Sequence, residues 1–231
     1  MVSKKTTVLI VEDEKDICDV IEYNLNREGY LTQSFDHGEA GLEAIRTETP
    51  GLVLLDLMLP GIDGLEICRK LKEDRLTRDI PIIMITAKTE ESDVILGLGV
   101  GADDYVEKPF SPKEVIARVK SVLRRAPLKE LVEEKSRITK DAFVIDTSSH
   151  EVTVDGVLKT FTATEFRLLH FFASHPGRVF SRDHLLSRVI SDDAVIIHRN
   201  IDVHVRSIRK KLGESRDLIE TVRGVGYKFK N

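Results

Sequence analysis

Three apolar runs of four residues, at 8–11, 52–55 and 82–85, and a shorter run at Tyr105-Val106 are spaced along the first half of the chain. The segments between them are long enough to hold helices, so the runs are predicted to be strands of a parallel sheet. Parallel strands bring their carboxyl ends to one edge, where sheets of this kind bind ligands. The pattern therefore predicts an α/β fold, doubly wound around a parallel sheet.

Polar residues stand at the ends of these predicted strands. Glu12 and Asp13 follow the first run, Asp56 follows the second and Thr86 the third, while Lys108 lies just beyond the fourth. Carboxylate oxygens suit a hydrated Mg²⁺ ion, and a carboxylate beside a lysine and a metal suits phosphoryl transfer. We therefore interpret Asp56 as a nucleophile that accepts a phosphoryl group, whose oxygens Lys108 and Thr86 contact. Each residue alone is typical of a helix cap or a turn, but their gathering at one edge favours the site.

The length and charge of the chain indicate a second domain. At 231 residues the chain leaves about a hundred residues for a second core. We predict a first domain at 1–125, a charged linker at 126–140 and a second domain at 141–231. The net charge is −4, yet residues 199–231 hold nine Lys and Arg against four Asp and Glu. This local positive balance indicates a nucleic-acid surface.

A basic helix predicted at 199–212 carries the strongest sign of DNA binding. Four apolar residues recur at helical spacing and predict one buried stripe, namely Ile201, Val205, Ile208 and Leu212. The residues predicted on its other faces are Arg199, Asp202, Val203, His204, Arg206, Ser207, Arg209 and Lys210. A basic helix of this length fits the major groove. A helix of this kind standing alone is more often a solvated face, but a glycine-rich hairpin predicted at 221–229, with Arg223 near its tip, follows it.

The first half resembles the receiver domain of two-component response regulators. The resemblance covers residues 5–125 and runs through the motifs Val11-Glu12-Asp13-Glu14, Leu55-Asp56-Leu57-Met58-Leu59-Pro60-Gly61, Asp63-Gly64, Ile85-Thr86-Ala87, Gly101-Ala102-Asp103-Asp104-Tyr105 and Lys108-Pro109-Phe110. It implies a CheY-like (flavodoxin-like) five-stranded parallel sheet and a phosphoryl group received by Asp56 from a phosphohistidine on a sensor histidine kinase. It also implies that the backbone carbonyl of Met58 binds Mg²⁺ with Glu12, Asp13 and Asp56, and that Thr86 and Tyr105 form a switch pair.

Residues 142–230 resemble the winged-helix effector domain of the OmpR/PhoB-type regulators. The resemblance runs through Thr164-Glu165-Phe166, Ser181-Arg182, the helix residues named above and the glycine-rich wing. It implies that the helix from Arg199 to Lys210 enters a major groove of double-stranded promoter DNA. The wing is expected to contact DNA through Thr221 and through Arg223, which reaches a minor groove. Ser207 stands where related regulators can carry a base-reading arginine.

The receiver resemblance also implies a symmetric homodimer after phosphorylation, formed by the face of the fourth helix, fifth strand and fifth helix. The matching apolar patch consists of Ile95, Leu98 and Ile116, and the matching ring of charges consists of Asp103, Asp104, Glu114, Arg118 and Arg125. Val94 stands where a basic partner for Glu114 is usual. Exposed ion pairs contribute only about 0.2–1 kcal/mol each, so the dimer is still expected.

Other functions remain open from the sequence alone. A receiver joined to an RNA-binding or protein-binding output would be an interaction module, but no aromatic platform for single strands is apparent. A phosphatase-like enzyme needs a general acid two residues after the nucleophile, where Met58 stands, so we expect only self-directed phosphorylation and dephosphorylation. RNA polymerase stays open as a partner, although the loop 191–194 lacks the tryptophan that relatives often carry. No apolar run approaches membrane-spanning length and no signal-peptide core is apparent, so we expect a cytoplasmic protein without a membrane partner.

Overall fold

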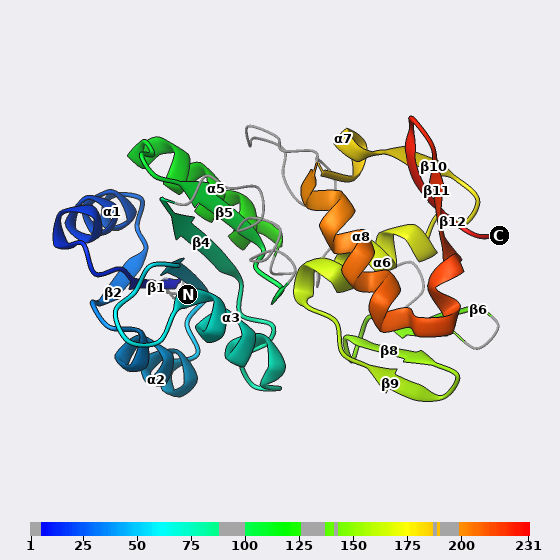
Figure 1. The fold of residues 1–231 in the computed structure, drawn as a ribbon, viewed down its shortest axis with the longest axis horizontal. Helices are drawn as coiled ribbons and strands as arrows, with labels where there is room; N and C mark the ends of the chain where they lie inside the picture. Colours follow the sequence, from blue (N-terminus) through cyan, green and yellow to red (C-terminus); the bar gives the residue numbers. More distant parts are fainter. Residues whose placement is uncertain (1–5, 88–99, 126–136, 141–142, 187–188, 190–198) are drawn as a thin grey trace, which may run out of the picture. The chain divides into compact units, whose positions relative to one another are not determined.

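The computed structural model describes residues 6–87, 100–125, 137–140, 143–186, 189 and 199–231. The chain divides into two compact units, Met1–Ala126 and Pro127–Asn231. Both can be followed in Figure 1 by colour, from blue to green for the first unit and from yellow-green to red for the second.

A parallel sheet with helices on both faces forms the first unit. Its described elements are β1 (Thr7–Val11), α1 (Lys15–Arg27), β2 (Leu31–Phe35), α2 (Gly38–Glu48), β3 (Leu52–Asp56), α3 (Gly64–Glu73), β4 (Ile82–Thr86), β5 (Asp104–Glu107) and α5 (Pro112–Arg125). The strands pair in the order β2-β1-β3-β4-β5, and every pair is parallel. The predicted doubly wound α/β fold is therefore confirmed.

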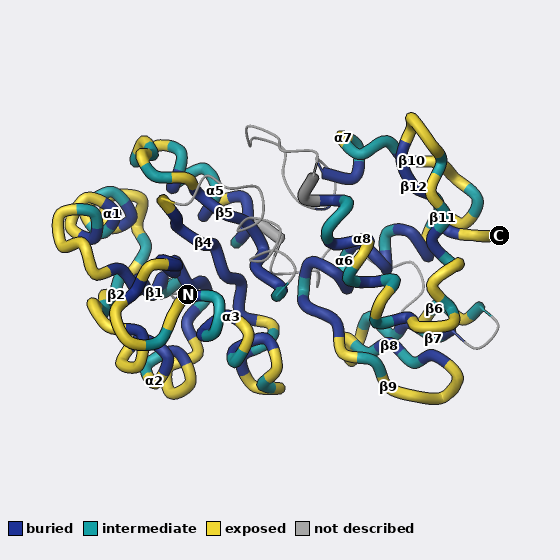
Figure 2. Tube along the Cα trace, viewed as in Figure 1, coloured by how far each residue is buried: buried dark blue, intermediate teal, exposed yellow. Residues whose placement is uncertain are grey.

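Successive side chains of β1 point to opposite faces of the sheet, and the core of this unit accordingly has two layers. Val8 and Ile10 pack with apolar residues of α1 and α5, whereas Leu9 and Val11 pack with those of α2 and α3. Figure 1 shows α1 and α5 on one face of the sheet and α2 and α3 on the other. Because the sheet is covered on both faces, β1, β3 and β4 are almost wholly buried (Figure 2).

The turn after β3 is held by a helix cap and by a close backbone contact. The Asp63 carboxylate accepts hydrogen bonds from the backbone N–H groups of Leu65 (2.7 Å) and Glu66 (3.1 Å), which caps α3. A Cβ on Gly64 would lie 2.1 Å from the carbonyl oxygen of Asp56. Only glycine fits there, and the start of α3 therefore lies directly against the strand end that carries Asp56.

The second unit combines two antiparallel sheets with helices. Its described elements are β6 (Arg137–Lys140), β7 (Phe143–Asp146), β8 (Glu151–Val154), β9 (Val157–Lys159), α6 (Ala163–Ala173), β10 (Val179–Ser181), α7 (Arg182–Leu185), α8 (Arg199–Leu212), the 3₁₀ helix η2 (Gly213–Leu218), β11 (Ile219–Val222) and β12 (Gly226–Phe229). The sheets have the orders β6-β7-β8-β9 and β10-β12-β11. With α8 before the β11–β12 hairpin, this is the expected winged-helix architecture.

The last four residues of the predicted linker belong to this unit instead. Strand β6 pairs antiparallel with β7, with Arg137 opposite Asp146 and Lys140 opposite Phe143. Only Ile138 of this strand packs against the core of the unit. A strand of four residues with one apolar residue among polar neighbours is too short to show a clear alternating pattern, so it could not be recognised from the sequence. The rest of the predicted linker lies outside the described residues.

One hydrophobic core joins the helices and sheets of the second unit. Helix α6 begins with a capping box, in which Thr162 and Glu165 each accept from the other's backbone N–H. The predicted stripe of α8 is buried, with Ile201, Val205, Ile208 and Leu212 at 2% exposure or less. None of the helices in the described part of the chain combines the length and the apolar character needed to span a bilayer.

Candidate functional site

The carboxyl edge of the parallel sheet gathers the predicted polar residues of the first unit. Glu12 follows β1, Asp56 ends β3 and Thr86 ends β4, while Lys108 follows β5. These strands are neighbours in the sheet. One carboxylate oxygen from each of Glu12, Asp13 and Asp56 lies within 4.8 Å of the others. The structure thus brings together the acidic cluster that was predicted at this edge.

Lys108 lies inside this cluster. Its Nζ donates to Asp56 Oδ2 (2.7 Å), Glu12 Oε1 (2.8 Å) and Glu14 Oε1 (2.9 Å). Burial alone would lower the pKa of Lys108, but the hydrogen bonds to Asp56, Glu12 and Glu14 outweigh it and raise the pKa above its ordinary value. The ammonium is therefore charged at neutral pH. Glu14 was not predicted at the site, although its place in the acidic run 12–14 was a signal.

Glu12 carries an unsatisfied acceptor at the same place. The residue is 2% exposed, and its Oε2 has no hydrogen-bond partner among the described residues. Burial raises the pKa of Glu12 to about 7; the charge of Asp56 adds to the rise, and Lys108 opposes it. A buried acceptor beside two further carboxylates is the donor set that a hard divalent cation takes. The residues present therefore fit a cation such as Mg²⁺.

Asp56 is fixed through both of its oxygens. Oδ2 accepts from Lys108, and Oδ1 accepts from the backbone N–H of Met58 (2.8 Å). Met58 is 56% exposed, and the contact that it makes with Asp56 comes from its backbone. Thr86 is 1% exposed and Tyr105 is 7% exposed. The Tyr105 ring lies in the core layer shared with α2 and α3, and burial raises the pKa of its hydroxyl.

Part of the predicted dimer face is described. The Arg118 guanidinium bonds both oxygens of Asp104 (3.0 Å each) and also Glu114 Oε1 (3.0 Å), all within the chain. Ile116 is half-buried against the core layer of α1 and α5. Val94, Ile95 and Leu98 lie outside the described residues, as does the side chain of Arg125.

Asp103 does not belong to an exposed ring of charges, so that prediction is corrected. The residue is 1% exposed. Its Oδ2 accepts from Lys72 Nζ (3.1 Å) and from the backbone N–H of Ile82 (3.0 Å). The carboxylate points into the unit because Lys72, at the end of α3, is itself buried and needs an anion there.

In the second unit, the faces of α8 divide the predicted DNA-contacting residues into groups. Successive residues of a helix are about 100° apart. Relative to the buried stripe, Val203, Arg206 and Lys210 therefore point outward, and both Arg206 and Lys210 are exposed. Arg199 falls on the same face by position, although its side chain lies outside the described residues. Arg223 and Thr221 are exposed on the wing, where Gly224, with φ +74°, forms the tight turn.

Two flanks of α8 bond to neighbouring elements. On one flank, Asp202 and Arg209 bond to residues of α7 and the wing. On the other, Ser207 Oγ donates to Glu165 Oε1 (2.5 Å) and Lys211 Nζ donates to Glu165 Oε2 (2.5 Å). Glu165 is 1% exposed and also accepts from the backbone N–H of Thr162 (2.8 Å). Ser207 thus joins α8 to the start of α6.

His204 was predicted on a DNA-facing side of α8, and this prediction is wrong. The residue is 0% exposed. It follows Ile201 by three positions and precedes Ile208 by four, which places it on the buried stripe of the helix. Its ring cannot reach DNA without leaving the core.

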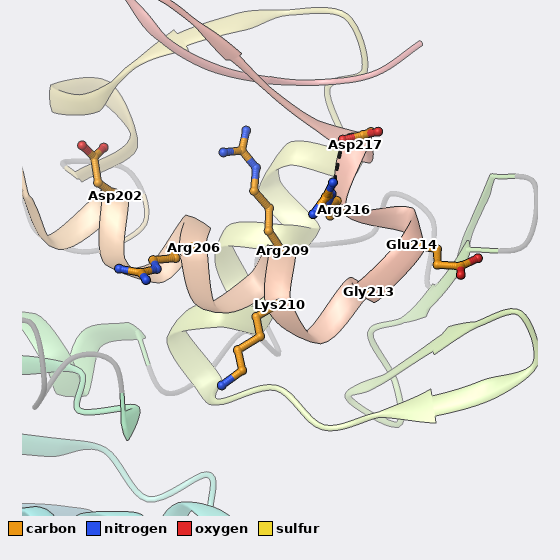
Figure 3. A pocket seen from close by; sticks show the side chains of 8 residues that line it. All are labelled: Asp202, Arg206, Arg209, Lys210, Gly213, Glu214, Arg216 and Asp217. Atoms are coloured by element: carbon orange, nitrogen blue, oxygen red, sulfur yellow. Dashed lines mark ion pairs between the residues drawn. The ribbon is translucent and has the colours of Figure 1, made fainter.

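An open hollow runs from the outer face of α8 to η2. It is lined by Asp202, Arg206, Arg209, Lys210, Gly213, Glu214, Arg216 and Asp217. Figure 3 shows the Arg206 and Lys210 side chains extending from α8, and Arg216 next to Asp217 on the following turn. Four cations against three anions make this surface weakly basic, in keeping with the local charge of the sequence.

Comparison with known proteins finds a family for each of the two units. The model of the response regulator receiver domain matches residues 8–120, and that of the C-terminal domain of transcriptional regulatory proteins matches residues 158–229. The phosphate regulon transcriptional regulatory protein PhoB of Pseudomonas aeruginosa is 45% identical over 224 residues, covering 96% of each chain. The transcriptional regulatory protein BaeR of Escherichia coli is 43% identical over 96% of this chain and 92% of that protein.

Solved structures show the same two-domain organisation. The response regulator DrrB of Thermotoga maritima, described as an OmpR/PhoB homolog, is 32% identical, covers 99% of this chain and superposes with a TM-score of 0.51. A single-residue mutant of RitR covers 98% of this chain with a TM-score of 0.79 at 22% identity, which shows a shared fold. The chain therefore belongs to the OmpR/PhoB family of response regulators, the phosphorylation-dependent, DNA-binding transcription regulators of two-component systems.

Proposed function

We propose that Asp56 is the phosphoacceptor of this regulator and that a sensor histidine kinase supplies the phosphoryl group. The observation that carries the proposal is the position of Lys108, whose Nζ lies 2.7 Å from Asp56 Oδ2 inside a cluster of further carboxylates. A carboxylate oxygen of Asp56 attacks the phosphorus of the phosphohistidine and forms a P–O bond. The P–N bond breaks, and the imidazole leaves with that electron pair and takes a proton from solvent.

The pocket residues hold Asp56 ready for this transfer. Lys108 and the backbone N–H of Met58 bond its two oxygens and fix the plane of the carboxylate. After transfer, the Lys108 ammonium pairs with the new phosphoryl oxygens, and the Thr86 hydroxyl at the end of β4 donates to one of them. The buried Tyr105 ring, which β5 carries into the core layer of α2 and α3, is the second member of the proposed switch pair.

Glu12, Asp13 and Asp56, together with the carbonyl of Met58, are proposed to hold Mg²⁺. The unsatisfied Oε2 of buried Glu12 supports this assignment. Bound Mg²⁺ would neutralise part of the negative charge on the pocket carboxylates and on the phosphoryl oxygens. Among the described residues, the Lys108 ammonium pairs with the carboxylates of Glu12, Glu14 and Asp56, and a cation would share that negative charge.

Substitution of Asp56 tests the acceptor. The full chain is incubated with Mg²⁺ and a small acyl phosphate, and phosphorylation is measured by intact mass and by the lability of the product to hydroxylamine. Asp56→Asn is expected to abolish incorporation. Asp63→Asn is the matched control, because Asp63 lies nearby but caps α3, a role that Asn also fills. Equal incorporation by the wild type and Asp56→Asn would contradict the assignment.

For the second unit, we propose that α8 lies in the major groove of promoter DNA. The bases and phosphates are faced by the outward stripe of α8, which consists of Arg199, Val203, Arg206 and Lys210. The wing contacts the neighbouring DNA backbone and the minor groove through Thr221 and Arg223. The exposure of Arg206 and Lys210 beside buried His204 supports this orientation. Arg206→Ala and Lys210→Ala are expected to weaken binding and to reduce its salt dependence.

Phosphorylation is proposed to promote a homodimer through the face that carries Asp104, Glu114, Ile116 and Arg118. In the chain itself, Arg118 is already bonded to Asp104 and Glu114, so a symmetric contact must share or exchange these partners. Sedimentation of the phosphorylated protein is expected to show a dimer at micromolar concentration, and a monomer would refute the proposal. A cytoplasmic location and contact with RNA polymerase belong to the same proposal.

A further inference from the structure

A polar cluster joins three elements around the wing. It consists of Arg182 at the start of α7, Asp202 and Arg209 on one flank of α8, and Tyr227 on β12. We call this cluster the wing clamp. Tyr227 is 5% exposed and lies at its centre. The Arg182 and Arg209 guanidinium carbons lie 5.1 Å and 5.6 Å from the centre of its ring, which is cation–π distance.

Asp202 is the acceptor that holds the clamp together. Its Oδ1 accepts from Arg182 Nε (2.7 Å) and from the Tyr227 hydroxyl (2.7 Å). A single oxygen therefore connects the recognition helix α8 to both α7 and the wing strand β12. Burial and the hydrogen bond to Asp202 raise the pKa of Tyr227, while Arg182 opposes the rise, so the phenol remains a donor at neutral pH.

Arg209 adds a second link between α8 and the wing, farther along the same flank of the helix. Its Nη2 donates to the carbonyl of Ile219 (2.6 Å) and to Thr221 Oγ1 (2.8 Å), and its Nε donates to the same carbonyl (3.1 Å). Ile219 begins β11. The two strands of the wing are thus each bonded to α8, β12 through Asp202 and β11 through Arg209.

This arrangement gives Asp202 a role different from direct contact with DNA. Its carboxylate faces the wing flank of α8 rather than the outward stripe of Arg206 and Lys210. An aspartate near a DNA surface repels phosphates, so without a structural role its removal should strengthen binding. If Asp202 instead holds the wing, its removal should weaken DNA binding, because the wing would lose its fixed position relative to α8.

We propose that Asp202 is a positioning residue, which fixes the wing against the recognition helix so that both reach DNA at once. The proposal rests on the proposed DNA-binding function of α8 and the wing, and it deepens it. A wing that is held rigidly against α8 reduces the conformational entropy lost on binding, because the wing and α8 are already aligned before they contact DNA.

The first test measures the wing without DNA. In the full chain, Asp202→Asn removes the charge that strengthens the bonds from Arg182 and Tyr227, and Tyr227→Phe removes the hydroxyl that donates to Asp202. Amide hydrogen exchange in β11 and β12 is expected to rise about tenfold in both variants, as for the loss of one hydrogen bond to a charged group. Exchange in α6 should stay unchanged, which separates local loosening from general instability. Wing exchange equal to that of the wild type would overturn the proposal.

The second test measures DNA affinity by fluorescence anisotropy, with a duplex selected from a random-sequence pool by the wild-type protein. Asp202→Asn is expected to bind about tenfold more weakly, because a misaligned wing should lose the binding free energy that one well-placed contact supplies. Glu214→Gln is the matched control, because Glu214 is an exposed acid lining the same hollow, and it should bind slightly more tightly. Tighter binding by Asp202→Asn would show that Asp202 is only a repulsive surface charge and would overturn the proposal.

A double-mutant cycle with the wing tip gives a readout that general destabilisation does not produce. Arg223→Ala is expected to weaken binding in the wild type but to have much less effect in Asp202→Asn, because the wing is already displaced. Additive effects would overturn the positioning role. If the wild type selects no duplex from the pool while Asp202→Asn still loosens the wing, the proposed DNA-binding function fails and the structural role of Asp202 stands.

Discussion

Lys72 and Asp103 form an ion pair inside the receiver unit, and its disruption has a calculable cost. Their side chains are 3% and 1% exposed. Lys72 Nζ donates to Asp103 Oδ2 (3.1 Å) and to the carbonyls of Arg78 (3.2 Å) and Ile80 (2.8 Å). Asp103→Asn keeps the shape and an acceptor for the Ile82 N–H but removes the only carboxylate bonded to this ammonium among the described residues. The buried charge of Lys72 would then be compensated by carbonyl dipoles alone.

The expected loss in the free energy of unfolding is about 3–5 kcal/mol, the usual cost of leaving one partner of a buried pair uncompensated. That is a large part of the stability of a domain and corresponds to about 10–20 °C in the melting temperature of the receiver transition. The assay is urea and thermal unfolding of the full chain, followed by circular dichroism. Lys72→Met in the Asp103→Asn background is expected to recover most of the loss, since it removes the uncompensated charge.

An exposed pair serves as the control for this experiment. Arg69 Nη2 lies 2.7 Å from Glu66 Oε1, but both side chains are well exposed. Glu66→Gln should therefore have a far smaller effect than Asp103→Asn, because water already screens the pair. If Asp103→Asn costs no more than Glu66→Gln, or if the double variant is less stable than the single one, the reasoning from burial is refuted.

The cation site, the turn after β3 and a buried histidine each give one further prediction. Excess chelator should abolish phosphorylation of the wild type by a small acyl phosphate, and transfer at an undiminished rate would contradict the proposed cation site. Gly64→Ala should lower both the melting temperature and the rate of phosphorylation, because its Cβ would lie 2.1 Å from the Asp56 carbonyl oxygen; an unchanged rate would refute that link. Burial lowers the pKa of His170, and the charges of His150 and His175 add to this, so the folded chain binds its proton less readily than the unfolded chain. The second unit should therefore lose stability as pH falls below about 6.5, and His170→Leu should weaken that dependence in unfolding curves at about pH 7 and pH 5.

The site in the receiver unit was predictable because its side chains follow the ends of apolar strands. The fold of the sheet sets the direction of Asp56, Thr86 and Lys108 once the strands are known. Strand β2 was not among the apolar runs, because Leu31–Phe35 lies at the sheet edge and is only partly buried. Its existence came from the resemblance to receiver domains.

Other features depended on tertiary contacts or on a closer reading of helical spacing. The partner of Asp103 is 31 positions away in the sequence, so no local pattern separates it from its neighbour Asp104. The partners of Asp202 lie 20 and 25 positions away, in α7 and β12. His204 is different, because its spacing from Ile201 and Ile208 already predicted burial, and helical geometry alone would have placed it correctly.

The measurement that tests the account most directly couples the two units. DNA affinity of the full chain is measured before and after treatment with Mg²⁺ and a small acyl phosphate, for the wild type, Asp56→Asn and the control Asp63→Asn. The account predicts that the wild type and Asp63→Asn become phosphorylated and bind the selected duplex more tightly, whereas Asp56→Asn does neither. Asp56→Asn that still gains both the phosphoryl group and the DNA affinity would contradict the assignment of Asp56 as the residue that switches this regulator.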